Sequence, residues 1–337
     1  MEPGELIEQI GARARAKKAK TSVAPEPLAP SQDPEPAAAK GSCLAPDRHP
    51  QRDFFIADIF GEAGLKDDVA SMEHPLFALK AGDLRVRRYE RNGNSVEVKP
   101  GPDGCATIHD KDIWIYCISL LIDALNRGRN DLNRTIRFTA YDFLVTTNRQ
   151  TSGEGYRLMG DALSRLRATT IETNIETGGQ RERRGFGLID SWHVVEKGPD
   201  NRAVAVSVTL PEWLYRSVQA RHVLTLSRDY FRIRKPLNRR IYELVRKHCG
   251  TQPLWGVSVS VLHAKSGSTA TLKKFRLNVK ALAAGVDGLL DYRLVLDIPT
   301  DTVTFYTRGP KGIAAQAQAQ AAGAGAQAAL KPAARRG

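Results

Sequence analysis

The sequence is poor in cysteine, and its cysteines are not paired. The four of them, Cys43, Cys105, Cys117 and Cys249, stand far apart, and no two show the CxxC spacing of a zinc knuckle or a redox pair. Cys117 falls within an apolar run, so we interpret it as a small core residue. Unpaired cysteines are typical of the reducing cytoplasm, where we expect this protein to act.

Long apolar runs and common catalytic motifs are also missing. No stretch of about 18 or more apolar residues is present and the N-terminus lacks an apolar signal region, so no membrane span or secretion signal is expected. There is no GxxxxGKS/T phosphate loop, no HExxH and no GxSxG. The seven histidines form no His-x-His pair, and His109 and His193 are interpreted as core or capping residues. We expect no enzyme, metal or cofactor.

What the chain has in excess is positive charge. It carries 50 Lys and Arg against 37 Asp and Glu, a formal net charge of +13, and its pI is about 9.7. Such an excess favours a polyanionic partner, because cations that neutralise phosphates release condensed counterions. Charge alone leaves DNA, RNA and a generic basic protein open. A hydrophobic content of 42% is enough for a buried core.

The order of elements in residues 228–308 is that of a winged helix-turn-helix. A basic segment runs into an amphipathic helix. There follow a strand (255–259), a short helix (259–265), a Ser/Gly turn (266–269), a second helix (272–284) and two strands (292–297 and 302–306). The helix after the turn carries Leu272, Phe275, Val279 and Leu282 on one face. A basic helix presented by a turn fits the DNA major groove.

A similar order occurs earlier in the chain. After a hairpin around Asn92-Gly93 comes a long helix whose apolar face spans 114–125. There follow a strand (135–138), a helix capped by Thr139 (140–146), a Gly/Ser/Thr-rich turn (148–155) and another helix (156–168). Then 170–175 and 186–194 are predicted to pair as a hairpin with its tip at 177–185, before a third strand, 203–210, and a short helix opened by Pro211. The element order therefore repeats.

These observations predict an α+β fold of tandem winged helix-turn-helix domains between disordered tails. The N-terminal segment is rich in Pro, Ala, Lys and Glu and cannot bury enough apolar surface to offset the entropy of ordering. The C-terminal segment is rich in Ala, Gln and Gly and is of low complexity. The predicted parts are a disordered basic, Pro/Ala-rich arm (1–52), an N-terminal winged-helix domain (53–225), a C-terminal winged-helix domain (226–310) and a disordered Ala/Gln/Gly-rich tail (311–337).

Eight blocks of the sequence resemble the plasmid replication initiator protein A family, and they recur in the family's order over roughly residues 70–308. They are MEHPLFAL (72–79), RVRRYERNGNSV (85–96), ATIHDKDIWIYCISLLIDALNRGR (106–129), RTIRFTAYDFLVTTNR (134–149), RLRATTIETNIETGG (165–179), GFGLIDSWHVV (185–195), LTLSRDYFRIRKPLNRRIYELVRKHCG (224–250) and LHAKSGS (262–268). The resemblance implies two winged-helix domains, as in iteron-binding initiators. Leu277 departs from the expected pattern, because it takes an outward place where a polar or basic residue is expected.

The resemblance also implies a function and partners. It implies binding of direct repeats at a plasmid origin, opening of adjacent AT-rich DNA, recruitment of host initiator and helicase-loading proteins, and repression of the protein's own gene. Related initiators pair through the first winged helix when they repress, so a homodimer through strands near 95–98 or 203–210 is expected. The expected location is the bacterial cytoplasm, on the plasmid or nucleoid, and no membrane partner is expected.

Four groups of residues are candidates for contact with double-stranded DNA. Hydroxyls and helix N-termini suit phosphates, and long cations suit guanine edges or phosphates. The second recognition helix and its turn supply Ser266, Ser268, Thr269, Lys273, Lys274, Arg276 and Lys280. The first supplies Thr151, Ser152, Tyr156, Arg157, Ser164 and Arg165, where Glu154 and Asp161 oppose phosphate contact. For both groups the alternative is a solvated charged face.

The other two groups flank these helices. A hairpin tip with Arg181, Arg183 and Arg184 is predicted to enter a minor groove as a flexible wing, and the alternative is an ordinary charged loop. Around Pro236, a helix N-terminus and its cations predict an anion site, and the alternative is a solvated linker. The cations there are Arg232, Arg234, Lys235, Arg239 and Arg240.

Three functions remain open, and the DNA around the gene separates them. An initiator binds an array of direct repeats beside an AT-rich segment. A plain transcriptional repressor with the same fold binds only an operator at its own promoter. A nicking enzyme, disfavoured by the missing histidine pair, leaves a covalent tyrosyl-DNA adduct.

Overall fold

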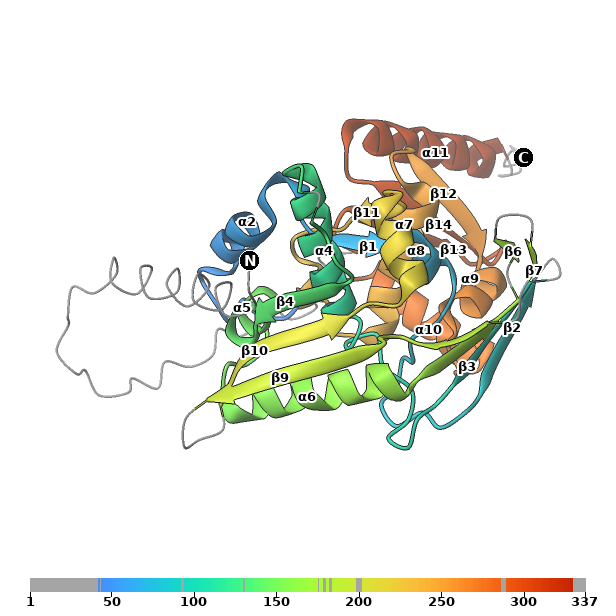
Figure 1. Ribbon diagram of the computed structural model, residues 1–337. Helices are drawn as coiled ribbons and strands as arrows, with labels where there is room; N and C mark the ends of the chain where they lie inside the picture. The colour runs from blue at the N-terminus through green and yellow to red at the C-terminus, as the bar shows by residue number, and fades with distance from the viewer. Residues whose placement is uncertain are drawn as a thin grey trace, which may run out of the picture. The chain divides into compact units, whose positions relative to one another are not determined.

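The computed structural model (Figure 1) describes residues 42, 44–91, 94–129, 131–174, 176–177, 180–181, 184–197, 202–285 and 289–329. These residues belong to one compact unit that spans 38–337. None of the helices in the described ranges is long and apolar enough to cross a lipid bilayer. Cys117 is buried and free, in agreement with its interpretation as a core residue.

The C-terminal half forms the winged helix that the sequence predicts. Its elements in chain order are α8 (Pro236–Cys249), β12 (Leu254–Ser258), α9 (Val259–Ser266), α10 (Leu272–Ala283), β13 (Tyr292–Asp297) and β14 (Thr302–Thr307). The strands form a sheet in the order β12-β14-β13, in which Leu294 pairs with Phe305 and Trp255 also pairs with Phe305. Pro236 stands at the first turn of α8, where its missing N–H costs nothing.

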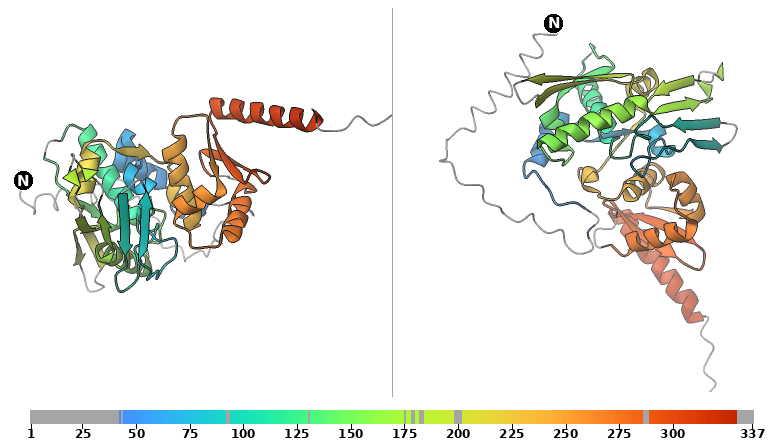
Figure 2. Two further views of the ribbon diagram at one scale, coloured as in Figure 1. Left: turned by 90° about the vertical axis from the view of Figure 1, so that its right-hand side faces the viewer. Right: turned by 90° about the horizontal axis from the view of Figure 1, so that it is seen from below.

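The N-terminal half contains a second winged helix with the same topology. Its elements are α4 (Asp112–Asn126), β4 (Thr135–Thr139), α5 (Ala140–Thr146), α6 (Gly153–Ala168), β9 (Ser191–Lys197) and β10 (Arg202–Thr209). The strand order is β4-β10-β9, which is the order of the other sheet element for element. The helix α6 packs against β9 and β10 (Figure 2, right, bright green and olive). The predicted repeat of element order is therefore confirmed.

The two winged helices also share their local turn chemistry. The last strand residue before each first helix of the helix-turn-helix caps that helix, because Thr139 Oγ1 accepts from Asp142 N (3.1 Å) and Ser258 Oγ accepts from Val261 N (3.3 Å). After each of these helices the chain adopts a positive φ, at Asn148 (57°) and Gly267 (68°). At Gly267 a side chain would also collide with Pro75, 2.7 Å from an added Cβ.

The predicted hairpin of 170–175 with 186–194 is only partly right. β5 (Thr170–Thr173) does pair with β8 (Arg184–Gly187), but residues 191–197 pair with β10 instead. Leu188 and Ile189 are fully buried, so the chain turns into the core between β8 and β9 and enters another sheet. β5 and β8 extend the predicted hairpin of β2 (Arg87–Arg91) and β3 (Asn94–Lys99) into a four-stranded sheet, β2-β3-β5-β8. β2 and β3 precede α4, whereas β5 and β8 belong to an insertion between the recognition helix α6 and the wing strand β9.

The remaining elements frame these two units. They are α2 (Arg52–Phe60), the 3-10 turn η1 (Gly61–Ala63), β1 (Lys66–Asp68), α3 (Val69–Glu73), the two-residue strands β6 (Glu176–Thr177) and β7 (Gln180–Arg181), α7 (Glu212–Gln219), β11 (Val223–Thr225) and η2 (Tyr230–Arg232). β1 pairs with β11. In the core, the ring of Tyr116 on α4 lies 5.3 Å from Phe60, 5.0 Å from Phe138 and 5.4 Å from Phe143, centroid to centroid. These contacts join α2, β4 and α5 to one buried helix.

The predicted N-terminal boundary needs correction. The predicted arm reaches residue 52, but Leu44 bridges to Ile233, and Arg52 is 1% exposed and pairs with Asp47 at 3.3 Å and Asp229 at 3.0 Å. The buried guanidinium of Arg52 is paired both within its own segment, with Asp47, and with Asp229 of the folded unit, and this fixes residues 44–52 to the fold.

The C-terminal tail differs as well. Residues 310–329 form the helix α11 (Pro310–Ala329), which follows β14 (Figure 2, red) and is not disordered as predicted. Alanine has the highest intrinsic helix propensity, and this outweighs the low complexity of the segment.

Candidate nucleic-acid interface

The helix α10 presents a basic face to solvent. Its inner face carries Phe275 and Val279, both fully buried. Its N-terminus is capped by Thr271, whose hydroxyl accepts from Lys274 N at 3.3 Å. On the outer face Lys273, Lys274 and Lys280 are exposed, as is Leu277, at 54%. α10, which follows α9 (Figure 1), thus carries three exposed cations on its outer side.

Arg276 is tied to the wing. Its guanidinium donates to both carboxylate oxygens of Asp301, at 2.7 and 2.8 Å, across from α10 to the β13–β14 turn. This hydrogen bond raises the pKa of Arg276 and lowers that of Asp301. Arg276 was expected among the phosphate-binding cations, but two of its guanidinium nitrogens already donate to the carboxylate of Asp301. Its place in the structure suits positioning of the wing against α10.

The hydroxyls of the turn before α10 serve the turn itself. Ser266 is fully buried, donates to His263 O at 2.7 Å and accepts from Ser268 N at 3.2 Å. Ser266 is therefore removed from the predicted contact set. Ser268 accepts from Ala270 N at 3.3 Å and is half-buried, whereas Thr269 is exposed.

The first recognition helix, α6, is balanced in charge. Arg157 donates to Glu154 at 2.7 and 2.8 Å and to Asp161 at 2.7 Å, and its hydrogen bonds lower the pKa of Glu154. Arg165 makes a two-pronged pair with Asp110, at 2.8 Å for both bonds. The acidic residues thus neutralise the predicted cations directly, which makes α6 the weaker attractor of phosphate.

The other predicted residues of the first site are spread around α6. Ser152 precedes the helix and is exposed, whereas Thr151, Tyr156 and Ser164 are half-buried. Arg181 lies in β7 and Arg184 in β8, so both belong to strands of the insertion, and Arg183 lies outside the described residues. The predicted arginine wing is therefore not the wing of the first winged helix, which is the β9–β10 hairpin.

The predicted anion site around Pro236 is only half exposed. Arg239 and Arg240 are 3% and 2% exposed, so they are removed from the predicted DNA contacts. Arg239 donates to Ile233 O (2.9 Å) and Phe231 O (2.7 Å). Arg234 and Lys235 remain at the surface.

Arg232, the fifth cation of this group, is half-buried. It donates to Ala45 O and to the Asp229 carboxylate, both at 2.9 Å. It therefore serves the packing of residues 44–52 and is a poor candidate for phosphate contact.

Arg240 anchors the second helix-turn-helix to the N-terminal half. Its guanidinium donates to Met72 O and Glu73 O, both at 2.9 Å, and to Lys265 O, at 3.0 Å. It also pairs with Glu243 at 3.2 Å. The end of α3, the start of α8 and the end of α9 therefore meet at one buried side chain, just before the turn that leads into α10.

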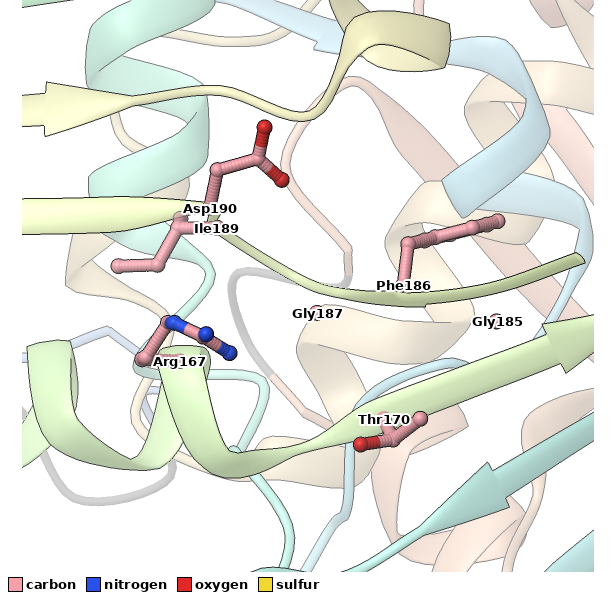
Figure 3. Close-up of a pocket in the computed structure, with 7 residues that line it drawn as sticks. All are labelled: Arg167, Thr170, Gly185, Phe186, Gly187, Ile189 and Asp190. Carbon is pink, nitrogen blue, oxygen red and sulfur yellow. The ribbon is translucent and has the colours of Figure 1, made fainter.

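Titratable side chains line concave surfaces elsewhere in the described residues, and one of these surfaces includes His109 and Asp112. The groove in Figure 3, about 460 Å³, includes Arg167, Phe186 and Asp190 in its lining, and Asp190 is paired with Arg134. No group of three metal-ligating side chains occurs in the described ranges. Burial, together with Arg239 and Arg149, lowers the pKa of His109 to about 2, so this histidine is uncharged at neutral pH.

One exposed cation of the wing was not among the predicted contact residues. Arg293 on β13 is exposed between the buried Tyr292 and Leu294. The alternation of polar and apolar residues in this strand was a sufficient signal, because period-2 patterns separate the faces of a strand. Thr271, the cap of α10, was missed because three other hydroxyls precede it.

Comparison with known proteins identifies the family. The model of the family "Replication initiator protein A" matches residues 66–294, which include both helix-turn-helix motifs. The chain belongs to the replication initiator protein A family. A relative named "Putative replication protein", from Wigglesworthia glossinidia brevipalpis, is 44% identical over 260 residues, or 76% of this chain and 94% of the relative.

A solved structure supports the fold of this replication initiator. Domains 2 and 3 of RctB superpose with a TM-score of 0.50 at 10% identity, covering 71% of this chain and 96% of that one. The similarity confirms the mixed α+β arrangement of paired winged-helix-like domains.

Proposed function

We propose that this protein starts plasmid replication by binding direct repeats at the origin through its two winged helices. The observation that carries the proposal is the outward face of α10, where Lys273, Lys274 and Lys280 are exposed on a helix held between a capped turn and a wing. A capped helix of this kind fits a major groove, and three cations attract the phosphates on its walls.

The two winged helices take unequal parts in this proposal. The second supplies most of the phosphate attraction, because its lysines stand free of the carboxylate pairs that hold Arg157 and Arg165 on α6. The first extends the contact along the duplex and sets the register. A binding unit with two linked helix-turn-helix motifs covers a longer site than one motif, which suits recognition of repeats of fixed length.

Opening of an AT-rich segment, recruitment of host initiator and helicase-loading proteins, and repression of the protein's own gene complete the proposal. They rest on family membership. We propose no chemical step. A transcriptional repressor without an initiation role uses the same fold, and the arrangement of binding sites separates the two.

The test is a titration of fluorescent duplexes that carry one direct repeat or a scrambled version of it. The wild-type chain should prefer the repeat. The double variant Lys273→Ala/Lys274→Ala should bind both duplexes more weakly and show a smaller dependence on salt. The matched control is Arg216→Ala on α7, an exposed cation paired with Glu212, which should bind as the wild type does. Equal binding of repeat and scrambled DNA by the wild type would refute specific recognition.

A further inference from the structure

Leu277 occupies the centre of the outward face of α10. An α-helix advances about 100° per residue, so Leu277 stands opposite the buried face of the helix. By the same geometry, Lys273 and Lys280 lie within about 60° of it on one side and Lys274 about 60° away on the other. All four side chains are exposed, Leu277 at 54%.

An isolated exposed leucine is ordinary on a protein surface. This one is surrounded by cations, on the helix face that enters the groove under the proposed function. In that pose the flanking lysines point to the walls, where the phosphates lie, and the central residue points to the floor, where the base edges lie. The residue at the floor is therefore an apolar one.

We propose that Leu277 reads the C5-methyl group of a thymine in the repeat. A leucine side chain has no hydrogen-bond donor or acceptor, so it cannot recognise the polar edge of any base. Thymine is the only unmodified base with an apolar group in the major groove. The inference rests on the proposed function and adds a specificity-determining residue to it: the lysines supply affinity for any sequence, and Leu277 selects an A·T pair of one orientation.

The experiment replaces each thymine of a repeat duplex by uracil, one position at a time, which removes the methyl group and nothing else. One or two positions should weaken wild-type binding about four-fold, because a buried methyl-sized group contributes about 0.8 kcal/mol. The Leu277→Ala variant should bind the thymine and uracil forms of those sites equally. This variant alters an exposed side chain, and its thermal unfolding should match that of the wild type.

Lys280→Ala is the matched control on the same face. It should weaken binding to both forms and keep the thymine-to-uracil ratio of the wild type. The inference is overturned if no position responds to uracil, or if Leu277→Ala keeps the wild-type response. In either case a preference for repeat over scrambled DNA leaves the proposed function standing, whereas loss of that preference in the wild type removes both.

Discussion

Lys111 and Glu243 join the two winged-helix halves through a buried ion pair. The ammonium of Lys111 lies 3.1 Å from Glu243 on α8 and 2.7 Å from Asp67 on β1, and all three side chains are at most 1% exposed. Tyr230 Oη donates to the other oxygen of Glu243 at 2.6 Å. The buried ammonium and both buried carboxylates therefore all have partners, as buried charges require.

Replacing Lys111 by methionine should destabilise the whole chain by about 3–5 kcal/mol, because it leaves the carboxylate of Asp67 buried without its cation, whereas Glu243 keeps Arg240. Burial already raises the pKa of Asp67 to about 7. In the variant Asp67 has lost this cation, so its pKa should rise further, and the stability of the fold should fall more steeply than that of the wild type as pH rises from about 5 to about 8. Urea denaturation at several pH values measures this. The control, Arg88→Ala at the exposed pair with Glu97, should cost less than about 1 kcal/mol; equal losses would contradict the argument.

Acid should loosen the contact between α3 and the second helix-turn-helix. His248, Lys247 and Lys265 all contact the carboxylate of Glu73 and hold its pKa far below its usual range. A depressed carboxyl pKa gives stability that is fully present above the unfolded value, about 4.3, and is lost as pH falls below it. Glu73→Gln should therefore be less stable at neutral pH and should lose less stability than the wild type between about pH 5 and 3. Parallel acid denaturation curves for the two proteins would show that Glu73 has no such role.

Cations of the second recognition helix should matter more for DNA affinity than those of the first. Lys273→Ala and Arg276→Ala should weaken binding to the origin repeat more than Arg157→Ala and Arg165→Ala do, with Lys273 giving the larger effect because Asp301 already occupies Arg276. A residue that touches only phosphate should reduce the salt slope by about 1. Titrations at several salt concentrations decide this. Larger losses at residues 157 and 165 would make the N-terminal domain the main anchor.

The position of the N-terminal boundary should be measurable by truncation. A chain that begins at residue 42 should unfold as cooperatively as the full protein, whereas one that begins at residue 53 should be less stable. The shorter chain loses the buried Arg52, which pairs with Asp229, and Pro46 O, which accepts from Asn148 Nδ2 at 3.0 Å. Thermal unfolding of the two truncations gives the comparison. Identical transitions would return the boundary to the sequence-based position.

Hydrophobic periodicity was sufficient to predict the repeated order of elements, because helices such as α6 and α10 bury only one face. It could not predict strand partners across an insertion, so residues 191–194 of the predicted strand 186–194 were assigned to the wrong hairpin. Arg239 and Arg240 looked exposed because two arginines after a proline resemble an anion site. Glu243, three residues after Arg240, was the sign of a buried pair, but only the packing of α3 on α8 reveals what they satisfy.

Footprinting of the wild-type chain on the DNA that flanks its gene tests the central claim most directly. Protection should appear as an evenly spaced array of direct repeats beside an AT-rich segment, and Lys273→Ala/Lys274→Ala should lose the whole array at the same protein concentration. A single protected operator at the gene's own promoter, with no array, would contradict an initiator and identify a repressor.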